Sequence, residues 1–61
     1  MSKAYALTQL LMLGPLSLAA MLEITGWPYA KLRQTVNTLR ENQTIHYCPY
    51  LGAYLIKQVQ S

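Results

Sequence analysis

The feature that most constrains this chain is a stretch of 19 residues, Ala4 to Leu22, that contains no charged side chain. After the basic start Met-Ser-Lys, such a stretch suits either an export or membrane segment or a set of short buried helices. A spanning helix needs about 20 predominantly apolar residues, whereas Gly14 and Pro15 interrupt this stretch and together break a helix. The sequence therefore favours two short helices over a segment that enters a membrane.

Composition is that of one small folded domain. The chain has 61 residues, of which 52% are hydrophobic and 11% charged, so it is too apolar and too poorly charged to resemble a disordered segment. Its length predicts a single domain over residues 1–61, near the lower size limit for folding alone. The lone cysteine, Cys48, excludes an intramolecular disulfide and favours a reducing compartment, so we expect a cytoplasmic protein.

Helical periodicity predicts three short helices in the first two thirds of the chain. Apolar residues recur at three- and four-residue steps in a first helix over about residues 3–13. Ser17 is a suitable N-cap for a second helix, and Gly26 suits the left-handed turn that ends it. A third helix is expected over residues 28–42, where Asn42 tolerates a left-handed turn at the end.

The last third of the chain has a β pattern. Segments 44–48 and 53–59 are rich in β-branched and aromatic residues, and they flank Pro49-Tyr50-Leu51-Gly52, a four-residue hairpin loop. Folding about that loop pairs Cys48 with Ala53, Tyr47 with Tyr54, His46 with Leu55 and Ile45 with Ile56. We expect one face of the hairpin to cover the helices, through Ile45, Tyr47, Tyr54 and Ile56. Three helices followed by a hairpin make an α+β fold.

With this order of elements, residues 14–45 resemble the core of a winged helix-turn-helix regulator of the MarR or IclR type. The matching positions are Gly14-Pro15, Ser17, Thr25-Gly26, Pro28, the apolar Leu32, Val36 and Leu39, and Ile45 at the start of the first wing strand. The resemblance implies a small winged helix-turn-helix domain, with helix 28–42 in the major groove of double-stranded DNA and hairpin 44–59 as the wing. It also implies sequence-specific binding by a transcriptional regulator of bacterial or phage origin.

A helical wheel of residues 28–42 indicates which side chains face the DNA. One pole of the wheel holds apolar or β-branched side chains, namely Leu32, Thr35, Val36 and Leu39. Polar side chains lie on the opposite pole. Amide side chains pair bidentately with adenine, and arginine contacts guanine or phosphate, so the base edges are assigned to Arg33, Gln34 and Asn37.

The other expected contacts lie around these base readers. Ala30 is small enough to let the helix approach closely and to meet a thymine methyl group. Tyr29 and Lys31 stand near the helix start, where the helix dipole favours contacts with the DNA backbone. On the wing, His46 and Lys57 are expected to contact phosphate.

Catalytic and metal chemistry have little support in the sequence. His46 and Cys48, at His-x-Cys spacing, supply two ligands, whereas a zinc site needs four, or three with a catalytic water. Without a phosphate loop or a cluster of acids, we expect neither enzyme activity nor a cofactor. The chain is also too short for a ligand-sensing domain, so no small-molecule ligand is expected.

A net charge of +3 is modest for a solitary DNA-binding protein. The alternative hypothesis is therefore a protein-protein interaction module with the same fold and no intrinsic DNA binding, suggested by the high apolar and tyrosine content. Useful DNA specificity from so small a domain requires two copies on adjacent half-sites or a protein partner. Both the first helix and the apolar edge of the wing are open to a homodimer contact.

Overall fold

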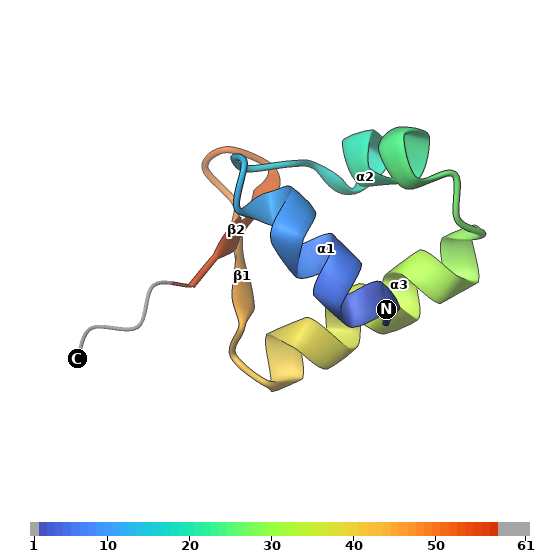
Figure 1. Cartoon of the computed structure of the whole chain (residues 1–61). Coiled ribbons are helices and arrows are strands. Elements are labelled where there is room, and N and C mark those ends of the chain that lie inside the picture. Colours follow the sequence, from blue (N-terminus) through green and yellow to red (C-terminus); the bar gives the residue numbers. More distant parts are fainter. Residues whose placement is uncertain (1, 58–61) are drawn as a thin grey trace.

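The computed structural model describes residues 2–57 of the chain. Its elements are, in order, α1 (Lys3–Leu11), α2 (Leu18–Thr25), α3 (Tyr29–Glu41), β1 (Ile45–Cys48) and β2 (Ala53–Ile56). Three helices followed by an antiparallel hairpin confirm the expected α+β, winged helix-turn-helix architecture (Figure 1). The end of the predicted second strand, Gln58 and Val59, lies outside the described residues.

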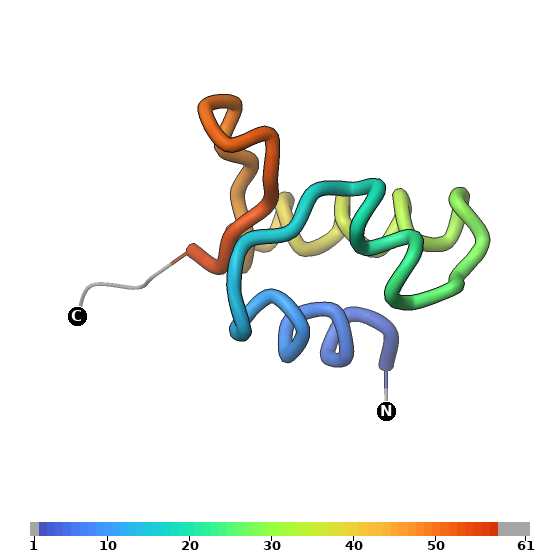
Figure 2. The backbone as a smooth tube through the Cα atoms, turned by 90° about the horizontal axis from the view of Figure 1, so that it is seen from above, coloured from blue at the N-terminus to red at the C-terminus, as the bar shows by residue number. Residues whose placement is uncertain are grey.

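The three helices form one body from which the hairpin projects. In Figure 1, α3 runs along the lower side of the molecule, α1 lies above it, and α2 lies at the top. Figure 2 shows that the hairpin stands at the C-terminal end of α3 and extends away from α1. The outer side of α3 is therefore left uncovered by the other described elements.

The uncharged stretch divides as predicted between α1 and α2, which have nine and eight residues. The α1 helix ends at Leu11, two residues before the predicted end, because the following turn is tighter than an α-helix. There the backbone N–H groups of Leu13 and Gly14 donate three residues back rather than four. In the described part of the chain, no helix has the length and apolarity needed to cross a bilayer.

The predicted boundaries of α2 are confirmed by its caps. The Ser17 hydroxyl accepts a hydrogen bond from the backbone N–H of Ala20 at 3.1 Å, which satisfies one of the free donors at the helix start. At the other end Gly26 is left-handed, with φ 67°, and its N–H donates to the Leu22 carbonyl.

At the end of α3 the expectation of a left-handed Asn42 is wrong. Asn42 keeps a right-handed backbone, with φ −80° and ψ 0°, because its N–H still donates to the Thr38 carbonyl at 3.0 Å. The chain reverses one residue later at Gln43, whose φ is 59°. The N–H of Thr44 then donates to the Leu39 carbonyl at 2.9 Å, which closes the end of the helix.

The hairpin has the predicted register at all four pairs, from Ile45 opposite Ile56 to Cys48 opposite Ala53. The hairpin covers the helices with fewer side chains than the sequence predicts. Ile45 and Tyr54 are buried and Ile56 is half-buried, but Tyr47 is 42% exposed. Tyr47 lies nearer the hairpin tip, outside the helical core, and packs on the ring of Tyr54 with centroids 5.0 Å apart.

A pairing that local sequence patterns do not reveal ties the hairpin to the helices. Leu16, in the link between α1 and α2, donates its backbone N–H to the Tyr54 carbonyl at 3.1 Å and accepts from the Tyr54 N–H at 2.7 Å. This bridge occupies the edge of β2 that faces away from β1. It fixes β2 of the wing to the link just before α2.

Every element contributes to one hydrophobic core. Its buried members are Leu7, Leu11, Met21, Leu32, Val36, Leu39, Ile45 and Tyr54. Leu22 and Trp27 are half-buried against this cluster, so both act as part of the packing. Within residues 2–57, no polar or charged side chain is buried. Folding therefore depends on apolar burial and on the caps.

Gly26 provides a direct test of the turn between α2 and α3. Gly26→Ala is expected to lower the free energy of unfolding by about 1 kcal/mol, because an L-residue is disfavoured at positive φ. A Cβ atom at this position would meet nothing within 4 Å, so no steric clash adds to the cost. Urea denaturation measures the change, and Gly26→Asn serves as the control with a smaller loss. Equal stability of Gly26→Ala and the native chain would contradict the left-handed turn.

Candidate nucleic-acid interface

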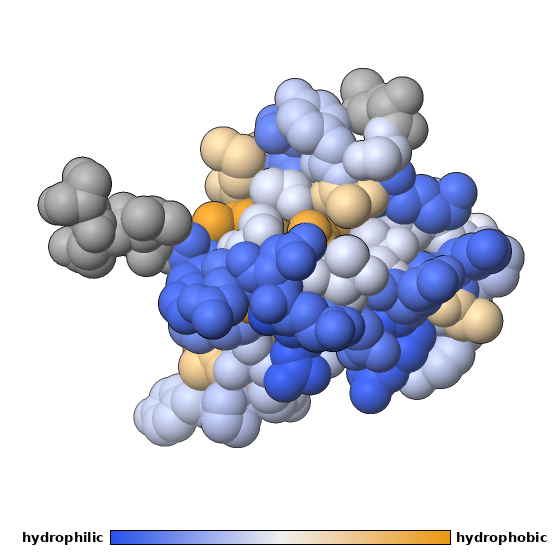
Figure 3. Space-filling view, turned by 90° about the horizontal axis from the view of Figure 1, so that it is seen from below, coloured by the Kyte–Doolittle hydropathy of each residue, from blue (hydrophilic) through white to orange (hydrophobic). Residues whose placement is uncertain are grey.

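The α3 helix buries one side and exposes the other. Leu32, Val36 and Leu39 are buried at spacings of four and three residues, and the residues between them point outward except for the half-buried Thr35. All six predicted contact residues of this helix are exposed, namely Tyr29, Ala30, Lys31, Arg33, Gln34 and Asn37. Figure 3 views the molecule from the α3 side and shows a broad hydrophilic band across it.

Five of these six residues border a single shallow hollow on the outer side of α3. Its lining consists of Tyr29, Ala30, Arg33, Gln34, Asn37, Thr38 and Glu41. Ala30 is the smallest of them, and its methyl group leaves the helix surface accessible between longer neighbours. Lys31 does not line the hollow and lies to one side of it. The structure thus brings the three predicted base readers, Arg33, Gln34 and Asn37, onto one surface.

The polar side chains of α3 differ in their availability. The Thr35 and Thr38 hydroxyls donate to the carbonyls of Lys31 and Gln34, at 2.9 Å and 3.0 Å, so they are engaged within the helix. Across residues 2–57, the side chains of Arg33, Gln34 and Asn37 make no hydrogen bond. Their donors and acceptors are therefore available to a ligand.

Glu41 belongs to the same surface, although the wheel singled out only neutral and basic side chains. It follows Ala30 by eleven residues, which is close to three helical turns, and it lines the hollow with Arg33 and Asn37. A second hollow next to the first is lined by Asn37, Arg40 and Glu41. Residue 41 already lies on the wheel of residues 28–42, where its position on the side of Ala30, Gln34 and Asn37 provides the signal for this acid. The surface carries both signs of charge.

The two wing residues occupy different places. Lys57 directly follows β2, and its Nζ donates to the Gln43 Oε1 at 3.2 Å, which holds it beside the turn that ends α3. His46 is exposed on β1, on the face of the hairpin opposite to the buried Ile45. The tip itself is uncharged, with Tyr50 95% exposed. The predicted phosphate contacts of the wing thus lie along its base and its first strand.

Comparison with known proteins does not identify the chain: no family model, curated protein or solved structure matches it. The similarity to MarR- and IclR-type regulators remains a prediction. Within residues 2–57, no three His, Cys, Asp or Glu side chains are placed to hold a metal ion. The outer surface of α3 is therefore the feature of the molecule that bears on function.

Adjacent positions on α3 test the division between its core and its outer surface. Leu32→Ala is expected to lower the free energy of unfolding by about 2–5 kcal/mol, because Leu32 is completely buried. Arg33→Ala is expected to change it by less than about 0.5 kcal/mol, because the side chain is exposed. Urea denaturation of both variants provides the comparison, and similar losses would show that Arg33 serves the fold.

Proposed function

We propose that this chain is a minimal winged helix protein that binds double-stranded DNA sequence-specifically and regulates transcription in the cytoplasm of a bacterial host. In this proposal α3 enters the major groove and the hairpin acts as the wing. The observation that carries it is the outer surface of α3, where Arg33, Gln34 and Asn37 surround the small Ala30 with their hydrogen-bonding groups unoccupied. A major groove about 12 Å wide admits a helix of this kind.

The proposed base readers match the hydrogen-bonding edges of the bases. A guanidinium such as Arg33 donates two hydrogen bonds to O6 and N7 of guanine. The carboxamides of Gln34 and Asn37 donate to N7 and accept from N6 of adenine. Each bidentate pair is worth about 1–3 kcal/mol of discrimination against the wrong base. Three such side chains on one surface are sufficient to specify a short half-site.

The remaining proposed contacts position the protein without reading sequence. Tyr29 and Lys31 lie in the first turn of α3, where free backbone N–H groups and the helix dipole attract phosphate. Lys57 and His46 add contacts from the wing. Because the tip lacks charge, we assign phosphate binding to the base and strand of the wing.

Substitution of the base readers tests the proposal. Arg33→Ala and Gln34→Ala are each expected to cost about 1–3 kcal/mol on the preferred sequence and to broaden the sequences selected from a random DNA pool. Fluorescence titration at two salt concentrations measures affinity, and sequencing of the selected pool measures preference. An unchanged preference in both variants would contradict the assignment of these residues.

Lys31→Ala is the matched control on the same helix. Its loss is expected to weaken binding to all sequences equally and to reduce the slope of log affinity against log salt by about one. Failure of the native chain to bind any DNA at low salt would overturn the proposed function itself.

Glu41 makes a separate prediction, because its carboxylate lies on the surface proposed to face DNA. Glu41→Gln removes the charge while keeping the shape, and it is expected to raise affinity for random DNA about fivefold at low salt, equivalent to about 1 kcal/mol. Glu23→Gln, an exposed site on α2, is the control with a smaller effect. Equal effects of the two substitutions would place Glu41 outside the interface.

A protein-protein interaction module is the second candidate function. The observation that favours it is the number of large apolar side chains at the surface, which include Met12, Leu13, Ile24, Tyr50 and Leu51. Salt-sensitive DNA binding supports the first function. A concentration-dependent increase in mass without DNA binding supports the second.

A further inference from the structure

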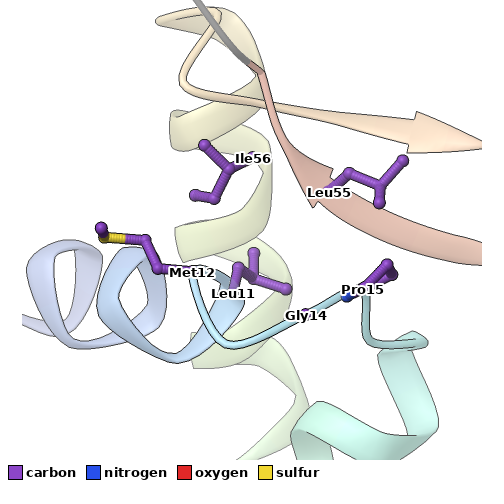
Figure 4. A pocket seen from close by; sticks show the side chains of 6 residues that line it. All are labelled: Leu11, Met12, Gly14, Pro15, Leu55 and Ile56. Atoms are coloured by element: carbon purple, nitrogen blue, oxygen red, sulfur yellow. The ribbon is translucent and has the colours of Figure 1, made fainter.

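Apolar side chains gather around the link between α1 and α2. Two shallow hollows share Gly14 and Pro15. The first is also lined by Leu11, Met12, Leu55 and Ile56. In Figure 4, Met12 and Ile56 lie near Leu11, and Leu55 lies near Pro15. The second continues over Leu10, Leu13, Leu16 and Ile24. The link surface is defined here by the accessible members of both, Met12, Leu13, Pro15, Ile24, Leu55 and Ile56.

Three large apolar side chains of the link surface are mostly exposed to solvent. Leu13 is 86% exposed, Met12 64% and Ile24 56%. Leu13 and Ile24 border the same hollow, so they form one contiguous patch rather than scattered residues. A contiguous exposed apolar patch marks a surface that another molecule covers.

The lack of charge in the two hollows restricts the kind of molecule that can cover them. Neither hollow has a charged residue in its lining, and the chain carries a net charge of +3. A charged partner surface would lose its hydration here without gaining an ionic counterpart. Two copies of this chain carry the same net charge, but copies that met at these two hollows would bring no like charges of the linings together. The occupant must present an uncharged apolar surface, which a second copy does.

Shape supports the same occupant. Leu13 projects beside a hollow, so one surface offers both a protruding side chain and a recess that receives one. In a two-fold dimer the same patch faces itself, and each copy must supply both features. We propose that the link surface is a dimer interface between two copies of this chain, with Leu13 of each copy packed into the hollow beside Ile24 of the other.

This interface leaves the outer surface of α3 free. In Figure 1 the link between α1 and α2 lies at the top of the molecule, whereas the outer side of α3 faces downward. Dimerisation is thus compatible with the proposed function but does not depend on it. A stable interface buries about 800 Å² per partner, close to a fifth of the 4343 Å² exposed by one chain. The six side chains of the link surface supply less, so the dimer is expected to be weak.

The decisive measurement is the mass of the full chain by sedimentation equilibrium between about 10 μM and 1 mM, a range that spans weak dimer dissociation constants. The native chain is expected to rise from the mass of one chain toward that of two. Leu13→Glu is expected to weaken association at least tenfold, because it brings two like charges together in the dimer. Leu51→Glu, at a 58% exposed leucine in the wing loop, is the matched control and should associate as the native chain does.

A charge exchange separates loss of the interface from loss of the fold. Leu13→Glu and Leu13→Lys, each expected to associate weakly with itself, are expected to form a mixed dimer when combined, because the two substituted side chains then attract. A native chain that stays monomeric at 1 mM, a mixture that does not associate, or equal damage from Leu51→Glu would each overturn the proposal. Dimerisation without DNA binding would leave this inference standing while removing the proposed function.

Discussion

The burial of Leu32, Val36 and Leu39 is the constraint on which the rest of this structure depends. Their side chains commit one side of α3 to a core that is shared with α1, α2 and the hairpin. Among residues 2–57, no second layer of helices or strands covers the opposite side of the helix. The same packing that stabilises the domain therefore leaves the outer surface of α3 to solvent or to a ligand. Fold and candidate interface are two sides of one helix.

The short connections then determine how the other elements meet that helix. Ser17 and Gly26 limit α2 to eight residues, so the chain reaches the start of α3 within a short turn. The Leu16–Tyr54 bridge fixes the hairpin to the same link by two backbone hydrogen bonds. Because Leu16 directly follows Gly14 and Pro15, its two hydrogen bonds hold the backbone of the link in place although the side chains of the link remain uncovered. That combination gives the link surface a defined shape, which a specific contact with a second copy requires.

Local patterns were sufficient to predict most of the fold. The loop at residues 49–52 and the alternation of side chains determine the hairpin register, and the two caps determine α2. The errors concern features that depend on the tertiary structure or on a long sequence separation. Tyr47 alternates correctly but extends past the core, and the pairing of Leu16 with Tyr54 joins residues 38 apart. The left-handed residue falls on Gln43 because hydrogen bonding continues through Asn42, which composition does not reveal.

The candidate interface was predictable in part for the same reason. A helical period places Arg33, Gln34 and Asn37 on the exposed side once the apolar positions are known. Glu41 follows from the same period. Its negative charge opposes the attraction of this surface to phosphate. With few basic side chains and one acid among them, the proposed complex is expected to gain only modest electrostatic attraction to phosphate. For the proposed function, discrimination must then come from hydrogen bonds to bases, and weak affinity per domain is offset when two copies bind adjacent half-sites. In the proposed dimer, the base contacts of a second copy would offset the weak phosphate attraction that follows from the low charge of each chain.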